Sequence, residues 1–303
     1  MHNYIHEAIT QHGLPAHFEA TVKQWYRPLA EKIAQRQSAN TKTLVLGIQG
    51  SQGSGKSTLA DFLRLLLAHE YKLNCAILSI DDFYLTRAER HALSESTHPL
   101  LMTRGVPGTH DVALAISTIQ QLCTLGKNER CTPVRFNKAI DDREAEAQWP
   151  SVSGPIDIVI LEGWCVGLSA QADHELNTPI NVLEQTEDKN GQWRRFVNGQ
   201  LSGHYSALFE LLDCLAVLKA PSFNSVFQWR LLQEQKLEQH WLQLPAAQRV
   251  HSKILNPSEI ERFISHYQRL TEHGLRTLPT TADWLLPLGD DHQILNLTSK
   301  ANR

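Results

Sequence analysis

A short glycine-rich segment carries the clearest chemical pattern in the chain. Residues Gly50–Ser57 read "GSQGSGKS" and match the phosphate-loop pattern G-x-x-x-x-G-K-[ST]. In such a loop the backbone N–H groups wrap phosphates, and the positive end of the following helix points at them. We expect Lys56 to reach the β- and γ-phosphates of ATP and Ser57 to bind Mg²⁺. The predicted nucleotide contacts are Gly50, Ser51, Gln52, Gly53, Ser54, Gly55, Lys56, Ser57 and Thr58.

Acidic residues follow two strand-like runs downstream of this loop. Asp81 and Asp82 stand at the carboxyl end of the run 74–81, and Glu162 ends the run 156–163. Ligands bind at the carboxyl edge of a parallel sheet, so Asp81 is a candidate to take a proton from an attacking hydroxyl. A pair of turn-forming aspartates explains this position equally well. Glu162 resembles a Walker-B carboxylate and is expected to hold Mg²⁺ through water.

The loop "HPLLMTRGVPGTHD" (98–111) precedes a helix and contains two candidate anion-binding residues. Arg104 and His110 are candidates to bind an acceptor anion beside the amino terminus of that helix. Thr109 or Asp111 can cap the helix. An ordinary loop with a cap accounts for those two residues, but less readily for Arg104 and His110.

The segment "PVRFNKAIDDR" (133–143) is the second candidate acceptor loop. Lys138 and Arg143 are assigned to the substrate anion, with a solvated charge cluster as the alternative. Asn137–Ile140 lacks the aspartate of a guanine-reading motif, and no apolar strand precedes it, so we reject a GTPase. Asp82 and Tyr84 complete the predicted substrate-binding set, although turn formation and packing also explain them.

A basic segment, Ser225–Leu237, follows the fourth predicted strand. In small-molecule kinases this position carries a lid that closes over the phosphates and excludes water. Arg230, assigned a catalytic role, and Lys236 are the candidates. A surface helix with scattered charge remains the alternative.

These segments require a scaffold that brings strand ends together. Short apolar runs alternate with amphipathic helical segments, which indicates an α/β fold with a parallel sheet covered by helices on both faces. We expect a helical extension over residues 1–38, broken near Gly13 and Pro15, and one domain over residues 39–303. The expected strands are Thr43–Gln49, Asn74–Asp81, Ile156–Gly163, Leu212–Ala220 and His292–Leu297. The expected helices include Lys56–Glu70, Asp111–Gly126 and Asn256–Leu270.

Composition narrows the class of protein. The 303 residues are 42% hydrophobic and 20% charged, which suits a globular protein with a core. A net charge of −3 gives no support to a nucleic-acid or anionic-membrane partner. The five cysteines are scattered, so we expect reduced thiols. We see no signal segment and no apolar run of membrane-spanning length, which predicts a cytoplasmic protein.

Taken together, the motifs resemble those of the plant/fungal-type D-glycerate 3-kinase family. "GSQGSGKST", "SIDDFYLT", "RGVPGTHD", "FNKAIDDR", "LEGW" and "FQWRLLQE" occur in that family's order and approximate spacing, from about Thr43 onward. The family belongs to the phosphoribulokinase, uridine kinase and pantothenate kinase group. The resemblance implies a P-loop NTPase fold with a lid segment and helical additions, and transfer of a phosphoryl group from ATP with Mg²⁺, most simply to D-glycerate.

The resemblance also assigns roles to particular positions. In uridine kinase-like relatives the catalytic aspartate lies two residues before the phenylalanine of the motif, which is Asp81 here. Arg104, His110 and Lys138 fall in loops that such relatives use around the acceptor. Residues 184–205 receive no role. A different small acceptor, such as a nucleoside or pantothenate, and a regulatory ATPase without an acceptor remain the alternatives.

Overall fold

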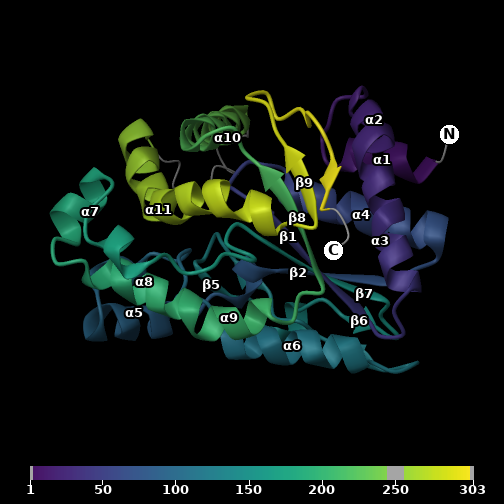
Figure 1. Ribbon diagram of the computed structural model, residues 1–303, viewed down its shortest axis with the longest axis horizontal. Coiled ribbons are helices and arrows are strands. Elements are labelled where there is room, and N and C mark those ends of the chain that lie inside the picture. The colour runs from purple at the N-terminus through teal and green to yellow at the C-terminus, as the bar shows by residue number, and fades with distance from the viewer. Residues whose placement is uncertain (1–2, 244–255, 301–303) are drawn as a thin grey trace.

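A six-stranded sheet forms the centre of the fold (Figure 1). The computed structural model describes residues 3–243 and 256–300. The strand order is β10-β9-β8-β1-β7-β2, and neighbouring strands are parallel except for β10 with β9. The strands are Leu44–Gly50 (β1), Cys75–Ser79 (β2), Ile158–Gly163 (β7), Cys214–Lys219 (β8), Trp284–Pro287 (β9) and Thr298–Ser299 (β10). The first four predicted strands are therefore confirmed as β1, β2, β7 and β8.

Alternating side chains of the inner strands enter two separate apolar layers. On β1, Val45 packs into one layer, whereas Leu46 and Ile48 pack into the other. All seven residues of β1 are buried. A strand buried on both sides needs helices on both faces of the sheet, and the predicted parallel α/β arrangement is confirmed in that form.

One face is covered by α4 and by the helices at the amino terminus. In α4, Leu59, Phe62, Leu63 and Leu66 are fully buried, as their helical spacing predicts. Figure 1 shows the amino-terminal helices beside α4. The helices on this face are Asn3–Gln11 (α1), Phe18–Thr21 (α2), the π-helix Val22–Tyr26, Arg27–Ser38 (α3) and Lys56–Tyr71 (α4).

The amino-terminal helices are not separate from the sheet. Ile5 of α1 and Leu29 of α3 share one apolar layer with α4 and β1. The predicted break near Gly13 and Pro15 lies between α1 and α2, and Gly13 has a φ of +61°. The division of the chain at residue 38 stays a prediction.

Helices α6, α8 and α9 cover the opposite face, with α6 and α9 side by side (Figure 1). Asp111 caps α6, because its Oδ1 accepts a hydrogen bond of 3.0 Å from the backbone of Leu114. Thr109, the alternative cap, instead accepts a bond from the backbone of Gly105. These helices span Val112–Thr124 (α6), Gln192–Ser202 (α8) and His204–Phe209 (α9).

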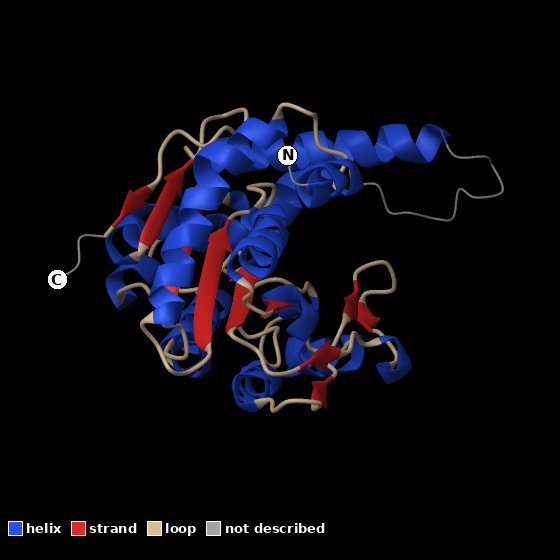
Figure 2. Cartoon of the chain, turned by 90° about the vertical axis from the view of Figure 1, so that its right-hand side faces the viewer, coloured by secondary structure: helices blue, strands red, loops and turns tan. Residues whose placement is uncertain are grey.

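Two long helices, α10 (Phe223–Gln243) and α11 (Pro257–Thr281), follow β8 and pack on each other. Figure 2 shows α10 running out from the body of the molecule. Helix α11 begins as predicted: Asn256 and Glu259 form a capping box, and Pro257 between them occupies the first helical position.

The last strands are not where the sequence places them. The strand expected over His292–Leu297 is wrong: this segment makes one isolated bridge, between Leu288 and Ile294, and the sheet ends with β9 and β10 instead. Ile294 is buried but Leu295 is 55% exposed, so the run lacks the two covered faces of an inner strand.

Short elements complete the fold, and two small antiparallel ladders among them were not expected. β3 pairs with β6, and β4 pairs with β5. The strands are Arg130–Cys131 (β3), Phe136–Asn137 (β4), Asp142–Arg143 (β5) and Val152–Ser153 (β6). The helical segments are Ile80–Phe83 (η2), Arg87–Ser96 (α5), Pro99–Met102 (η3), Glu146–Gln148 (η4), Asp173–Leu176 (η5) and Val182–Glu187 (α7).

Two expectations from composition concern cysteines and membranes. All five cysteines lie within the described residues, and all are free thiols. Burial raises the pKa of Cys75 to about 12, which keeps this thiol protonated. In the parts of the chain that the structure describes, we find no helix with the length and apolarity that crossing a membrane requires.

Candidate active site

A cavity of about 690 Å³ opens where β1, β2 and β7 end. Its wall combines the glycine-rich loop, the residues that follow β2 and β7, and one side each of α10 and α11. The lining residues are Leu14, Gln52, Gly53, Gly55, Lys56, Ser57, Thr58, Asp81, Tyr84, Arg104, Lys138, Trp164, Trp229, Arg230, Leu232, Gln233, Phe263, Tyr267 and His292. The cavity lies at the carboxyl edge of the sheet, where parallel α/β folds bind ligands.

The glycine-rich loop joins β1 to α4, which is the predicted strand-loop-helix context. Gly53 and Gly55 have φ values of +78° and +86°, which residues other than glycine rarely adopt. A Cβ atom on Gly53 would lie 2.9 Å from the Cβ of Trp229, so only glycine fits there. Ser51 and Ser54 are buried behind the cavity wall, whereas Gln52 through Thr58 otherwise face it.

Ser57 and Glu162 bring two side-chain oxygen groups together beneath the loop. The Ser57 hydroxyl donates a hydrogen bond of 3.1 Å to Oε1 of Glu162. Glu162 is 5% exposed, and its Oε2 has no hydrogen-bond partner among the described residues. A buried carboxylate oxygen beside a hydroxyl fits a hard cation, and Mg²⁺ takes one or two such protein ligands together with phosphates and waters.

Asp81 is held in the cavity wall by two donors. The Tyr84 hydroxyl donates to its Oδ1 at 2.8 Å, and Nζ of Lys138 donates to its Oδ2 at 2.7 Å. Burial raises the pKa of Asp81, but Lys138 and then Lys56 outweigh that effect and hold the pKa at about 2. Asp81 is therefore ionised at neutral pH and lines the cavity.

Asp82 turns away from the cavity although it is the next residue. Its Oδ2 accepts a bond of 3.0 Å from Arg135, and its Oδ1 accepts one of 3.2 Å from the backbone of Phe136. Burial raises the pKa of Asp82 and outweighs the attraction of Arg135. These contacts tie η2 to β4, so the geometry gives no support to a substrate contact for Asp82.

Arg104 and Lys138, two predicted acceptor-binding cations, both line the cavity. Lys138 contacts Asp81 as described, and its side chain is 61% exposed. Arg104 forms an ion pair with Asp141 and lies over the ring of Phe136 at 5.5 Å from the centroid. Both positive groups therefore reach the cavity from different loops.

Arg143 and His110 are near the site but outside the cavity wall. Arg143 donates to the backbone oxygen of Tyr84 at 3.0 Å and to Asp111 at 3.1 Å. His110 is 5% exposed, and its Nδ1 lies 2.5 Å from the hydroxyl of Tyr205. Burial lowers the pKa of His110 to about 4, so the ring is neutral. The predicted substrate contacts of these two residues have no geometric support.

Arg230 reaches the cavity from α10. It forms an ion pair of 2.5 Å with Glu234 and lies over the ring of Phe263, 5.6 Å from its centroid. Lys236, the second lid candidate, lies in the part of α10 whose side chains are outside the described residues.

The sequence did not indicate several aromatic residues of the wall. Phe263 and Tyr267 belong to an apolar stripe of α11 that packing alone explains. Tyr267 also donates to the backbone oxygen of Arg104 at 3.2 Å, and its ring meets Trp164 edge to face at 4.9 Å. Two signals in the sequence were available. Tyr267 places a hydroxyl within an apolar stripe, and Trp164 directly follows the strand that carries Glu162. Leu14, Trp229 and His292 gave none.

A phosphate loop on a parallel α/β sheet, facing an ionised aspartate and lysines in one cavity, defines a P-loop kinase. No family model matches the chain. An uncharacterized kinase of Schizosaccharomyces pombe is 31% identical over 240 residues, which cover 75% of this chain and 79% of that protein. The chloroplastic D-glycerate 3-kinase of Arabidopsis thaliana is 33% identical over 243 residues, covering 78% of this chain but only 48% of that relative.

A solved structure has the same fold. D-glycerate 3-kinase from Cryptococcus neoformans superposes with a TM-score of 0.73 at 24% identity, covering 93% of this chain and 99% of that one. This likeness confirms the predicted P-loop fold. The chain belongs to the plant/fungal-type D-glycerate 3-kinase family, and it is a kinase, as the motifs indicated.

Proposed function

We propose that the protein transfers the γ-phosphoryl group of ATP to the 3-hydroxyl of D-glycerate and forms 3-phospho-D-glycerate. One observation carries the proposal: ionised Asp81 lies in the same cavity as Lys56 of the phosphate loop and the cations Arg104 and Lys138. The printed activities of the Arabidopsis and Cryptococcus relatives support this acceptor.

On the nucleotide side, residues Gly50–Thr58 hold the triphosphate through backbone N–H groups, and Lys56 stabilises charge on the γ-phosphate. Ser57 and Glu162 would hold Mg²⁺, which when bound neutralises charge on the β- and γ-phosphate oxygens. Arg230 on α10 would approach the phosphates from the lid side.

On the acceptor side, Arg104 and Lys138 attract the carboxylate of glycerate. The acceptor oxygen forms a bond to the γ-phosphorus while the bond from that phosphorus to the β–γ bridging oxygen breaks, and ADP leaves. The hydroxyl proton passes to the carboxylate of Asp81. Asp82, His110 and Arg143 would act from behind the wall by fixing its backbone and aromatic rings.

A panel of acceptors tests the proposal. With ATP and Mg²⁺, D-glycerate is expected to give the highest kcat/KM among D-glycerate, L-glycerate, uridine, pantothenate and ribulose 5-phosphate, and a chelator should abolish transfer. A clear preference for uridine or pantothenate would remove this acceptor and keep the kinase. ATP hydrolysis that no acceptor stimulates would instead favour a regulatory ATPase. Location in the cytoplasm and independence of nucleic acids and membranes stay predictions.

A further inference from the structure

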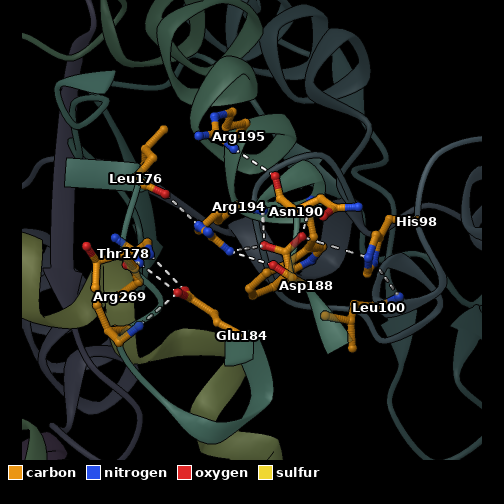
Figure 3. A network of polar contacts seen from close by, with 12 residues as sticks. His98, Leu100, Leu176, Thr178, Glu184, Asp188, Asn190, Arg194, Arg195 and Arg269 are labelled. Atoms are coloured by element: carbon orange, nitrogen blue, oxygen red, sulfur yellow. Dashed lines mark hydrogen bonds and ion pairs between the residues drawn. The ribbon is translucent and has the colours of Figure 1, made fainter. Parts of the chain in front are cut away.

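Residues 184–205, which carry no recognised motif, are fixed by buried charges (Figure 3). Arg194 donates to Asp188 at 2.9 Å, and both side chains are almost fully buried. Arg269 of α11 donates to Glu184 at 2.6 Å, and Glu184 is 0% exposed. Breaking a buried pair of this kind leaves an uncompensated charge. The pair of Arg194 with Asp188 therefore fixes the segment internally, and the pair of Glu184 with Arg269 fixes it against α11.

This segment packs directly behind the loop that precedes α6. A Cβ atom on Gly108 would lie 2.6 Å from Cε1 of Phe196, so α8 approaches the loop as closely as a glycine allows. In the next helix, α9, Tyr205 is fully buried, and its hydroxyl accepts a hydrogen bond of 3.1 Å from the backbone N–H of Gly108. The segment therefore delivers one phenol to the back of the active-site wall.

The hydrogen bonds of Tyr205 determine the tautomer of His110. The backbone N–H of Gly108 can only donate, so the Tyr205 oxygen accepts there and its own proton needs an acceptor. Nδ1 of His110 lies 2.5 Å away and provides it. Nε2 of His110 is buried and has no hydrogen-bond partner among the described residues in either tautomer. The opposite tautomer would also leave the hydroxyl proton of Tyr205 without an acceptor there, so it leaves one more polar group unpaired. His110 is thus neutral and carries its proton on Nε2.

His110 in turn supports the residue that orients Asp81. Its ring stacks on Tyr84 with centroids 4.4 Å apart and planes 23° apart. The backbones of Tyr84 and His110 also form an antiparallel bridge. The Tyr84 hydroxyl donates to Asp81 at 2.8 Å. An unbroken series of contacts thus runs from Tyr205 to the proposed proton acceptor.

We propose that Tyr205 is a positioning residue for phosphoryl transfer and acts on Asp81 through His110 and Tyr84. It holds the imidazole in one tautomer and one ring orientation, which fixes Tyr84 and aims the carboxylate of Asp81. The proposal rests on the proposed function, because it needs Asp81 to contact the acceptor hydroxyl.

A double-mutant cycle tests the coupling. Tyr205→Phe keeps the ring and removes the hydroxyl, and we expect kcat to fall about tenfold while the KM for ATP is unchanged. Combined with Tyr84→Phe, it should lower kcat no further than Tyr84→Phe alone. Tyr4→Phe, the same change far from the cavity, should leave kcat as it is. Losses that multiply in the double variant, or a normal kcat in Tyr205→Phe, would overturn the proposal.

Nitrogen NMR of labelled histidine tests the first contact without any turnover. The His110 signals, assigned by their absence in His110→Gln, are expected to show a protonated Nε2 and an unprotonated Nδ1. This pattern should become mixed in Tyr205→Phe. A protonated Nδ1 in the unchanged protein would refute the positioning role. This result is independent of the acceptor, so a failed acceptor panel with the expected tautomer would refute the proposed function instead.

Discussion

The two walls of the cavity are built in different ways. The wall proposed to bind phosphates is one continuous segment, Gly50–Thr58, and a loop of this kind binds phosphates mostly through its backbone N–H groups. The proposed acceptor wall takes side chains from three separate segments of the chain: Asp81 and Tyr84 from one, and Arg104 and Lys138 from one each. A local pattern can specify the first wall, whereas the second exists only after distant loops have packed together.

The largest effect is expected on the phosphate wall. Lys56→Ala should lower phosphoryl transfer by roughly three orders of magnitude or more, because Lys56 stabilises charge on the transferred group. Lys56 lies on the cavity wall and contributes no apolar core, so the unfolding temperature should change little. Steady-state turnover and calorimetric unfolding measure the two quantities. Lys72→Ala, on an exposed helix end away from the cavity, is the control, and near-normal turnover of Lys56→Ala would exclude this phosphate site.

A smaller loss is expected on the acceptor wall. Asp81→Asn should reduce transfer by about two to four orders of magnitude, since the amide cannot accept the hydroxyl proton. ATP affinity, measured by calorimetry, should hardly change, because the loop binds the triphosphate. A loss of transfer with unchanged ATP affinity would show that the two walls act independently, whereas a large loss of ATP affinity would contradict this.

Asp82→Asn is the matched control for Asp81. The side chain faces Arg135 and the backbone of β4, so turnover should fall much less. A crippled Asp82→Asn with an active Asp81→Asn would move the proton acceptor by one residue. Normal turnover in both variants would favour the turn-forming explanation of this pair.

The difference between the walls also explains what the sequence could predict. The strand-loop-helix around Lys56 and the buried stripe of α4 depend on residues that are neighbours in the chain. Asp82 and Arg143 are charged residues of the types that an acceptor site needs. In the structure, however, both form hydrogen bonds with the backbone of neighbouring segments instead. No pattern within one segment reveals which partner a side chain will find.

Aromatic residues show the converse case: residues that the sequence assigns to the core also line the cavity. Tyr267 and Phe263 have the spacing of core residues, and most of each ring is indeed packed. Both residues also line the cavity, where Tyr267 meets the ring of Trp164, a residue far away in the sequence. Similarly, His292 was assigned to a strand, whereas it lies in a turn and stacks on Trp229 at 4.3 Å.

The smallest predicted effect separates two cations that are close in the sequence, of which only Lys138 lines the cavity. Lys138→Ala should raise the KM of the acceptor about tenfold, the effect of one lost charge-assisted contact, and leave the KM for ATP unchanged. Arg135→Ala is the control, because Arg135 pairs with Asp82 and does not line the cavity.

The same variant should change the pH dependence of transfer. The ionised form of Asp81 is the active one, and its pKa of about 2 means that activity is lost only as the pH falls through that value. Burial raises this pKa and Lys138 is the first cation that opposes it, so Lys138→Ala should shift the acid limb of kcat toward higher pH. Measuring kcat between about pH 4 and pH 8 should then show the rate falling at the acid end in Lys138→Ala but not in Arg135→Ala. An identical shift in both variants would mean that overall surface charge, rather than the contact between Lys138 and Asp81, controls this carboxylate.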